Sequence, residues 1–258
     1  MALMAPATSI DWQQPWLAPL RHVGECVVAR QRSGMSLPDA LNLDGAPRRF
    51  VPHEALPEGE PYESYIARSA QVPTRENLHD FFNGLVWHAE PALKSRLNQL
   101  QAQAIGRDGI GPRRGALRDA LTLFDENGAL LDGPDALQQA LRQRDWQQLL
   151  VHQRALWREA RLRIVGHALL AQLSVAPRKG LTAHVWVGDA LGAAAENLAR
   201  QTLSAAAGAG RARLVAGESS AGLLWRCRGV PRPARETLGP GRFGGFARLK
   251  PLKAAGSP

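Results

Sequence analysis

The residues best suited to chemistry form a polar stripe on one predicted helix. Arg75, His79 and Asn83 follow one another at intervals of four residues, and Asp80 lies on the adjacent stripe. Side chains at this spacing lie above one another on one face of a helix. Because the stripe is interleaved with large apolar residues such as Phe81, we expect it to be partly buried. An unpaired polar group costs about 1–3 kcal/mol there.

Candidate partners for this stripe occur in two later segments. The first segment contains two polar pairs, Arg118–Asp119 and Asp125–Glu126, on either side of apolar residues. The second contains His167, which directly follows Gly166. A glycine has no side chain and therefore permits close backbone approach at that point.

This number of imidazole and carboxylate groups predicts a site for a divalent metal, as a metal-dependent hydrolase would need. In this hypothesis the metal ligands are His79, Asp119 and His167. The catalytic groups are His79, Asp80, Asp119 and His167. A small-molecule or phosphorylated substrate is bound by Arg75, Asn83, Arg118, Asp125 and Glu126. The alternative is that these groups only tie the helix to the later segments.

The elements that position these residues follow from periodicity and capping. Pro73 and Thr74 predict a helix start, with Thr74 as the N-cap, and apolar residues at helical spacing continue the helix over 75–89. A second helix is expected over 92–105, after Pro91. The Asn127–Gly128 pair predicts a tight turn, so residues 121–124 and 129–131 are interpreted as a short β-hairpin near 121–131.

Helical spacing of apolar residues from 134 to 173 predicts two further helices with a break near Asp145. Residues 181–187 alternate as a strand does, although a helix edge is equally compatible, and 190–207 are alanine-rich and favour helix. The fold class is therefore mainly α with a small β-hairpin (α+β), with helices around one core. We expect a flexible Pro-rich arm over 1–60, a helical core domain over 61–207 and a basic tail over 208–258.

Positive charge is concentrated in this tail. Residues 1–172 carry 19 basic and 19 acidic residues, whereas 173–258 carry 13 basic and 4 acidic ones. A basic tail attracts polyanions. This supports an alternative function, a non-catalytic binding module that contacts nucleic acid or another polyanion through residues 211–258. The other interpretation is a solvated tail without a partner.

Targeting signals are missing from the sequence. Its two cysteines, Cys26 and Cys227, are far apart and have no metal-ligand or redox spacing. The first ten residues lack the charged and apolar regions of a signal peptide, and no run of 18 apolar residues predicts a membrane span. We therefore predict a cytoplasmic protein that does not enter a membrane.

Three separated blocks of sequence carry a resemblance to a known family. The first is VPTRENLHDFFNGLVW, from Val72 to Trp87, followed by Lys94 and by Leu97–Asn98. The others are RDALTLFDENG over 118–128 and GHAL over 166–169. In this order the blocks resemble the bacterial domain-of-unknown-function 3025 family, over about residues 50–190. The resemblance implies a folded domain built around these polar blocks and no particular activity.

The C-terminal part departs from the family pattern. Gly229–Val230–Pro231 is followed by Arg232 where the family continues with glycine and tryptophan, and residues 241–246 replace an aromatic and acidic piece. The departure falls within the basic tail. A family site located there is therefore in doubt.

Overall fold

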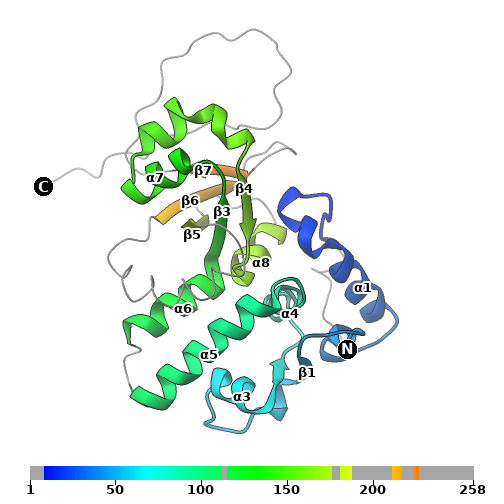
Figure 1. Cartoon of the computed structure of the whole chain (residues 1–258). Coiled ribbons are helices and arrows are strands. Elements are labelled where there is room, and N and C mark those ends of the chain that lie inside the picture. Colours follow the sequence, from blue (N-terminus) through cyan, green and yellow to red (C-terminus); the bar gives the residue numbers. More distant parts are fainter. Residues whose placement is uncertain (1–8, 112–114, 176–180, 188–210, 217–222, 227–258) are drawn as a thin grey trace, which may run out of the picture.

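The computed structural model describes residues 9–111, 115–175, 181–187, 211–216 and 223–226 (Figure 1). Eight α-helices occur in these residues: α1 (Arg21–Arg32), α2 (Leu37–Leu41), α3 (Tyr62–Ser69), α4 (Leu78–Ala89), α5 (Pro91–Asp108), α6 (Ala116–Asn127), α7 (Asp135–Gln143) and α8 (His167–Val175). Short 3₁₀ or π turns lie at Pro15–Leu20, His53–Ala55, Gln148–His152 and Arg154–Arg158.

The strands form two sheets. In the smaller sheet, β1 (Arg49–Pro52) pairs in parallel with β2 (Gln71–Thr74). The larger sheet contains β3 (Gly128–Asp132), β4 (Arg161–Ile164), β5 (Leu181–Val187), β6 (Arg211–Ala216) and β7 (Leu223–Arg226), in the order β4-β3-β5-β6-β7. Only β3 and β5 are parallel neighbours in it. The mainly α architecture with small β elements is confirmed.

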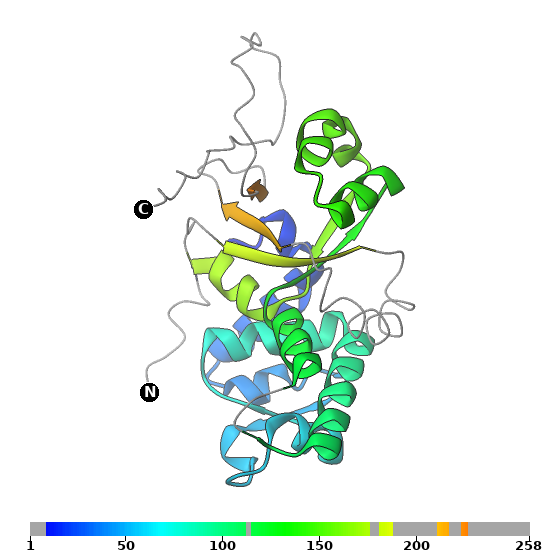
Figure 2. The ribbon, with the colours of Figure 1, turned by 90° about the vertical axis from the view of Figure 1, so that its left-hand side faces the viewer.

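Helices α3, α5 and α6 make up one end of the molecule, and the larger sheet with α7 lies at the other end (Figures 1 and 2). Helix α8 packs against α4, α6 and β5, so it connects the two ends. A large apolar core runs from the N-terminal helices through α4 and α8 to β5, and a smaller cluster fills the space between α5, α6 and β3. Helix α4 lies in the middle and is buried almost all round.

The segment before residue 60 differs from the predicted flexible arm. From Ile10 onward it contributes fully buried side chains to the main core, among them Leu17, Val27, Leu37 and Phe50. Several of its prolines lie at the start of short helices and do not exclude them; Pro38, for example, lies in the first turn of α2. The arm is therefore part of the same core.

The start of the site helix lies three residues later than predicted. Thr74 belongs to β2, and the N-cap of α4 is Asn77, whose side chain accepts a hydrogen bond from the backbone N–H of Asp80. Thr74 bonds back to the carbonyl of Val72 instead. Parallel pairing with β1 holds residues 71–74 extended, which local capping signals do not encode.

The hairpin predicted near 121–131 is wrong. Residues 116–127 form the single helix α6, because Leu121 and Phe124 are spaced to bury one helical face against α5 and β3. Gly128 has φ −73° and ψ 148°, which is extended backbone. Asn127–Gly128 therefore ends a helix and starts β3, which lies between β4 and β5, and makes no tight turn.

The two long helices predicted over 134–173 are replaced by several shorter elements. Helix α7 ends at Gln143, with Arg144 in the left-handed region at φ 58°. Strand β4 then pairs antiparallel with β3 before α8 begins. The alternation of residues 181–187 does form a strand, β5, as one of the two interpretations predicted.

Among the described residues no helix is long and apolar enough to cross a bilayer. The alanine-rich segment over 190–207 and most of the predicted tail lie outside the described residues. Of the tail, the backbone of β6 and β7 is described, and it extends the larger sheet beyond β5.

Candidate metal centre

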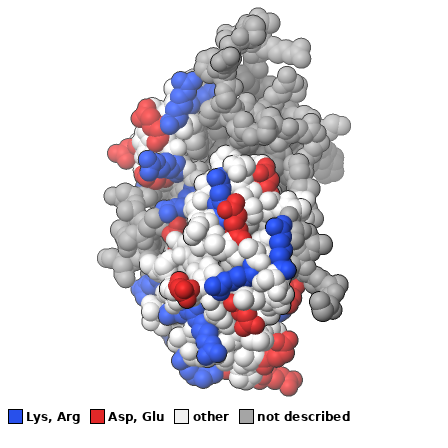
Figure 3. Space-filling view, turned by 90° about the vertical axis from the view of Figure 1, so that its right-hand side faces the viewer, with Lys and Arg blue, Asp and Glu red and all other residues white. Residues whose placement is uncertain are grey.

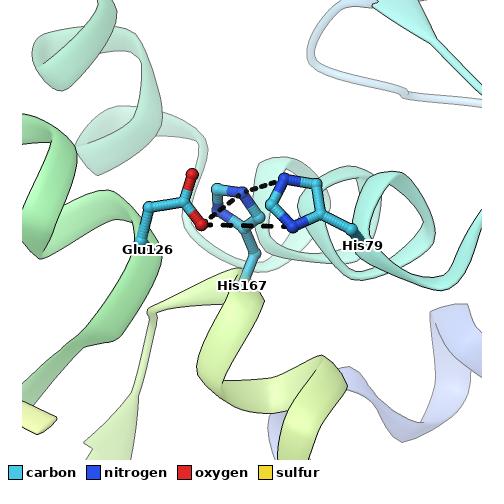
Figure 4. Close-up of side chains that lie close together, drawn as sticks. All are labelled: His79, Glu126 and His167. Carbon is cyan, nitrogen blue, oxygen red and sulfur yellow. Dashed lines mark hydrogen bonds and ion pairs between the residues drawn. The ribbon is translucent and has the colours of Figure 1, made fainter. Parts of the chain in front are cut away.

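Three helices bring one titratable side chain each to the same point. His79 comes from the first turn of α4, Glu126 from the last turn of α6 and His167 from the first residue of α8. Figure 4 shows the three side chains pointing toward one another. Residues far apart in sequence therefore form one compact group.

A close backbone contact sets the position of His167. The amides of Val165 and Gly166 both donate to the carbonyl of Gly128, at 3.0 and 2.9 Å. A Cβ atom on Gly166 would lie 2.5 Å from both the Cα of Asn127 and the amide nitrogen of Gly128. The predicted close approach at Gly166 is confirmed, and it places the start of α8 directly beside the end of α6.

The distances within the group are short. The Nε2 atoms of His79 and His167 are 3.1 Å apart, and the rings meet edge to face. His167 Nε2 lies 3.6 Å from Glu126 Oε2, and His79 Nδ1 lies 4.0 Å from the same oxygen. One ligand atom from each residue can be chosen so that all lie within 4.8 Å of one another.

The group is buried on one side and open on the other. The side chain of His167 is 4% exposed, whereas those of Glu126 and His79 are 33% and 44% exposed. A small molecule or ion can therefore reach the group from the side of His79 and Glu126. His167 forms its inner wall.

A second layer of charge lies behind His167. Asp125 Oδ2 is 3.7 Å from His167 Nδ1, and Asp125 Oδ1 accepts a 2.6 Å hydrogen bond from Lys94 Nζ. The Lys94 side chain is buried, and its ammonium also lies 5.6 Å from the centre of the Trp87 ring. Lys94, Asp125 and His167 therefore form a continuous row that leads to the cluster.

Burial and neighbouring charges shift the pKa values of His167 and Asp125 in this row. Burial lowers the pKa of His167 to about 3, although Asp125 opposes the shift. Burial acts to raise the pKa of Asp125, but Lys94 and His167 beside it outweigh burial and hold that pKa below its ordinary value. At neutral pH the His167 ring is therefore neutral and Asp125 is ionised. Metal ligation requires a neutral imidazole of this kind.

The position of Glu126 disfavours the charged form of its carboxyl group. Burial raises its pKa; His79 opposes the shift, whereas Asp125 adds to it. Asp125 and Glu126 also occupy the last turn of α6, which contains no basic residue. The negative end of the helix dipole disfavours carboxylates there. Local rules broken in this way are typical of functional sites.

The remaining members of the predicted α4 stripe have structural contacts. Asp80 Oδ2 accepts from the backbone N–H of Arg75 at 2.7 Å and from the Arg75 side chain at 3.3 Å, which fixes the turn before α4. Asn83 is buried, and its Nδ2 donates to the hydroxyl of Tyr62 at 3.1 Å. The partial burial predicted for the stripe is confirmed for Asp80 and Asn83.

The structure does not bring the other two predicted partners to the histidines. Asp119 is exposed in the first turn of α6, seven residues before Glu126. It belongs to no potential metal-binding group among the described residues. Arg118 lies beside it, and its backbone carbonyl faces Gln101 of α5. Because residues 121–124 are helical, Asp119 and Glu126 are separated by about two helical turns.

Sequence reasoning missed Lys94 and Tyr62. Both line a pocket with Trp87 and Asp125 next to the cluster. Burial raises the pKa of Tyr62, and nearby Asp80 adds to the shift. The sequence does contain a signal for Lys94, since Lys94, Asn98 and Gln101 are spaced to lie on one face of a helix. In the structure all three lie on α5 and are buried.

Comparison with known proteins supports the resemblance found in the sequence. The family model described as Protein of unknown function (DUF3025) matches residues 48–215. No curated protein and no solved structure matches the chain. The matched region covers more than half of the chain and contains His79, Glu126 and His167, as well as Lys94 and Asp125. The chain therefore belongs to the DUF3025 family.

Proposed function

We propose that the protein is a metal-dependent hydrolase whose divalent ion is held by His79, Glu126 and His167. The observation that carries this proposal is the convergence of two imidazole nitrogens and a carboxylate oxygen, with His167 Nε2 3.1 Å from His79 Nε2 and 3.6 Å from Glu126 Oε2. Glu126 takes the place that the sequence hypothesis gave to Asp119.

These separations fit a shared ion. Two ligand atoms that each lie about 2.0–2.2 Å from a tetrahedral zinc ion are about 3.3–3.5 Å apart. The two contacts of His167 Nε2 bracket that range. His79 faces His167 with Nε2 and Glu126 with Nδ1, and one of its nitrogens lies within 4.8 Å of both other ligand atoms, so binding of a shared ion requires a small shift of His79. Hydrogen bonding between the histidines accounts for the first contact only. A shared ion accounts for both contacts.

The donor set and the exposure support a catalytic ion. Catalytic zinc sites use three protein ligands, including the two-histidine, one-glutamate set, and keep a further position open. The exposed side of His79 and Glu126 leaves room for such a position. A bound zinc ion supplies Lewis-acid chemistry and makes water nucleophilic at neutral pH. Hydrolysis then adds the elements of water across the scissile bond of the substrate.

The metal content of the purified full-length chain tests the proposal. We expect about one zinc or manganese ion per chain after equilibration with that metal and removal of the excess. His167→Ala and Glu126→Gln should each lower the bound fraction at least tenfold, because each removes one of three ligands. Asp119→Asn is the matched control on α6 and should retain the metal, since Asp119 lies outside the cluster.

Activity is measured on the same samples. With p-nitrophenyl acetate and p-nitrophenyl phosphate as probes, turnover should be lost on chelation and return with Zn²⁺. A chain that binds no divalent ion contradicts the proposal. A chain that selects Fe²⁺ contradicts hydrolysis, because two histidines and one carboxylate also bind iron in oxygenases.

The polyanion-binding function stays a second proposal, supported by the charge of the C-terminal residues. On the face shown in Figure 3, acidic and basic side chains of the described residues are interspersed. Residues 227–258 alone carry seven basic residues and one acidic residue. Such a segment suits a polyanion through charge alone.

We expect the full chain to be retained on heparin at low salt and released as salt rises, and deletion of residues 227–258 to abolish retention. The deletion begins after β7, because a deletion from residue 211 would also remove β6 and β7 from the larger sheet. Equal retention of both chains at every salt concentration would exclude the tail as the contact.

A further inference from the structure

In the row formed by Lys94, Asp125 and His167, the His167 ring can carry its proton on either of two nitrogens. A neutral imidazole carries one proton, on either Nδ1 or Nε2. His167 Nδ1 is buried and forms no close hydrogen bond among the described residues; Asp125 faces the ring with its Oδ2, 3.7 Å from this atom, and with its backbone carbonyl. His167 Nε2 faces His79 and Glu126. The tautomer therefore decides which nitrogen can bind a metal.

The charge of Asp125 favours one tautomer. A carboxylate repels the lone pair of an unprotonated Nδ1 and attracts an Nδ1–H group. Glu126 Oε2, 3.6 Å from Nε2, acts in the opposite direction, but an unprotonated Nε2 can accept a hydrogen bond from His79, whereas the buried Nδ1 has no donor beside it. Lys94 holds the other carboxylate oxygen at 2.6 Å, so the carboxylate stays directed at the ring. With the proton on Nδ1, Nε2 carries a lone pair and accepts the 3.1 Å hydrogen bond from His79.

We propose that Lys94 and Asp125 are positioning residues that fix His167 in the Nδ1–H tautomer, so that its Nε2 lone pair faces His79 and Glu126. The use of this lone pair as a metal ligand rests on the proposed function. The tautomer itself does not, because it is set in the metal-free protein. Carboxylates behind ligating histidines have this role in many metal sites.

The substitution Asp125→Asn tests the proposal through an asymmetry of the amide group. In the wild-type chain Lys94 donates to Asp125 Oδ1. In the variant Lys94 can donate only to the carbonyl oxygen of the asparagine amide, so this oxygen must face Lys94. The amide nitrogen then points at His167 and donates to Nδ1. We expect the proton of His167 to move to Nε2, which removes the lone pair that faces His79. Because the replacement is isosteric, we expect the backbone to stay unchanged.

The readout is the ring nitrogen shifts of His167 in the full, chelator-treated chain labelled with ¹⁵N-histidine, assigned by loss of its signals in His167→Gln. Wild type should show Nδ1–H and Asp125→Asn should show Nε2–H. Affinity for Zn²⁺ should fall about 10–100-fold in Asp125→Asn. The double variant Lys94→Met/Asp125→Asn should recover the Nδ1–H tautomer, because its amide is free to turn its oxygen toward the ring.

A second double variant covers the case in which Asp125→Asn does not fold around an unpaired Lys94. Lys94→Met/Asp125→Leu removes both charges and the side-chain acceptor and leaves the backbone carbonyl of residue 125 in place. The Nδ1–H preference should therefore weaken there but be kept in Lys94→Met/Asp125→Asn. An Nδ1–H tautomer in every variant overturns the positioning role. If the tautomer responds as expected but wild type binds no Zn²⁺, the positioning role stands and the metal-dependent function fails.

Discussion

Gly166→Ala is expected to lower the free energy of unfolding by about 3 kcal/mol or more, because it forces a methyl group against backbone that cannot move aside. The new Cβ would lie 2.5 Å from the Cα of Asn127 and the amide nitrogen of Gly128. Relief requires α8 to separate from the end of α6. The hydrogen bonds from Val165 and Gly166 to the Gly128 carbonyl would then break. Urea unfolding followed by circular dichroism measures the loss.

The matched control is Gly106→Ala on α5. Nothing lies within 4 Å of a Cβ at Gly106, so alanine adds helix propensity without a clash. We expect this variant to be more stable than wild type by about 0.5–1 kcal/mol.

The same separation of α8 from α6 should move His167 away from Glu126 in Gly166→Ala, so any folded fraction of this variant should lose zinc binding. Equal stability of both variants would contradict the close packing at Gly166.

Local patterns predicted those elements whose residues already determine their structure. The periodicity of Leu78, Phe81, Phe82 and Leu85 indicates α4, and apolar residues nearly all round this helix indicate that its polar stripe is partly buried. Alternation over 181–187 allowed β5. A glycine directly before His167 indicated close backbone approach, and the contact with Asn127 confirms it.

Elements set by distant partners were not predictable in the same way. Leu121 to Phe124 suit a helix or a strand, and contact with α5 and β3 decides for α6. Residues 161–164 form β4 because β3 is available as a neighbour, and nothing local distinguishes them from the helical pattern around them. The capping signal at Thr74 was overridden in the same way by pairing with β1.

The candidate site illustrates this difference. His79 and His167 stand out by residue type, and Asp125 and Glu126 by adjacency. The choice of Glu126 over Asp119 depends on which turn of α6 meets α8, and therefore on the contact at Gly166. Lys94 is a polar residue in a long helix, and only the fold shows that it is buried against Asp125.

The second large effect separates stability from function on a single helix. Phe81→Ala should lower the free energy of unfolding by about 3–5 kcal/mol, because Phe81 is fully buried and its truncation leaves a cavity. Phe81 packs against the ring of Phe82, at 5.3 Å between centroids, and against Trp12 at 6.4 Å. Neither ring can fill this cavity without leaving the position that it occupies in the core.

His79→Ala, two residues away, should change stability by less than about 1 kcal/mol. The His79 side chain is 44% exposed, so water can replace it as the partner of His167 Nε2. The same variant should lose zinc binding, whereas Phe81→Ala should retain it in the folded fraction. Asp119→Asn should change neither property, since Asp119 is exposed. Chemical unfolding and zinc titration of the three variants give both readouts. If His79→Ala destabilises the chain nearly as much as Phe81→Ala, the histidine pair is a structural contact between α4 and α8 and not a metal site.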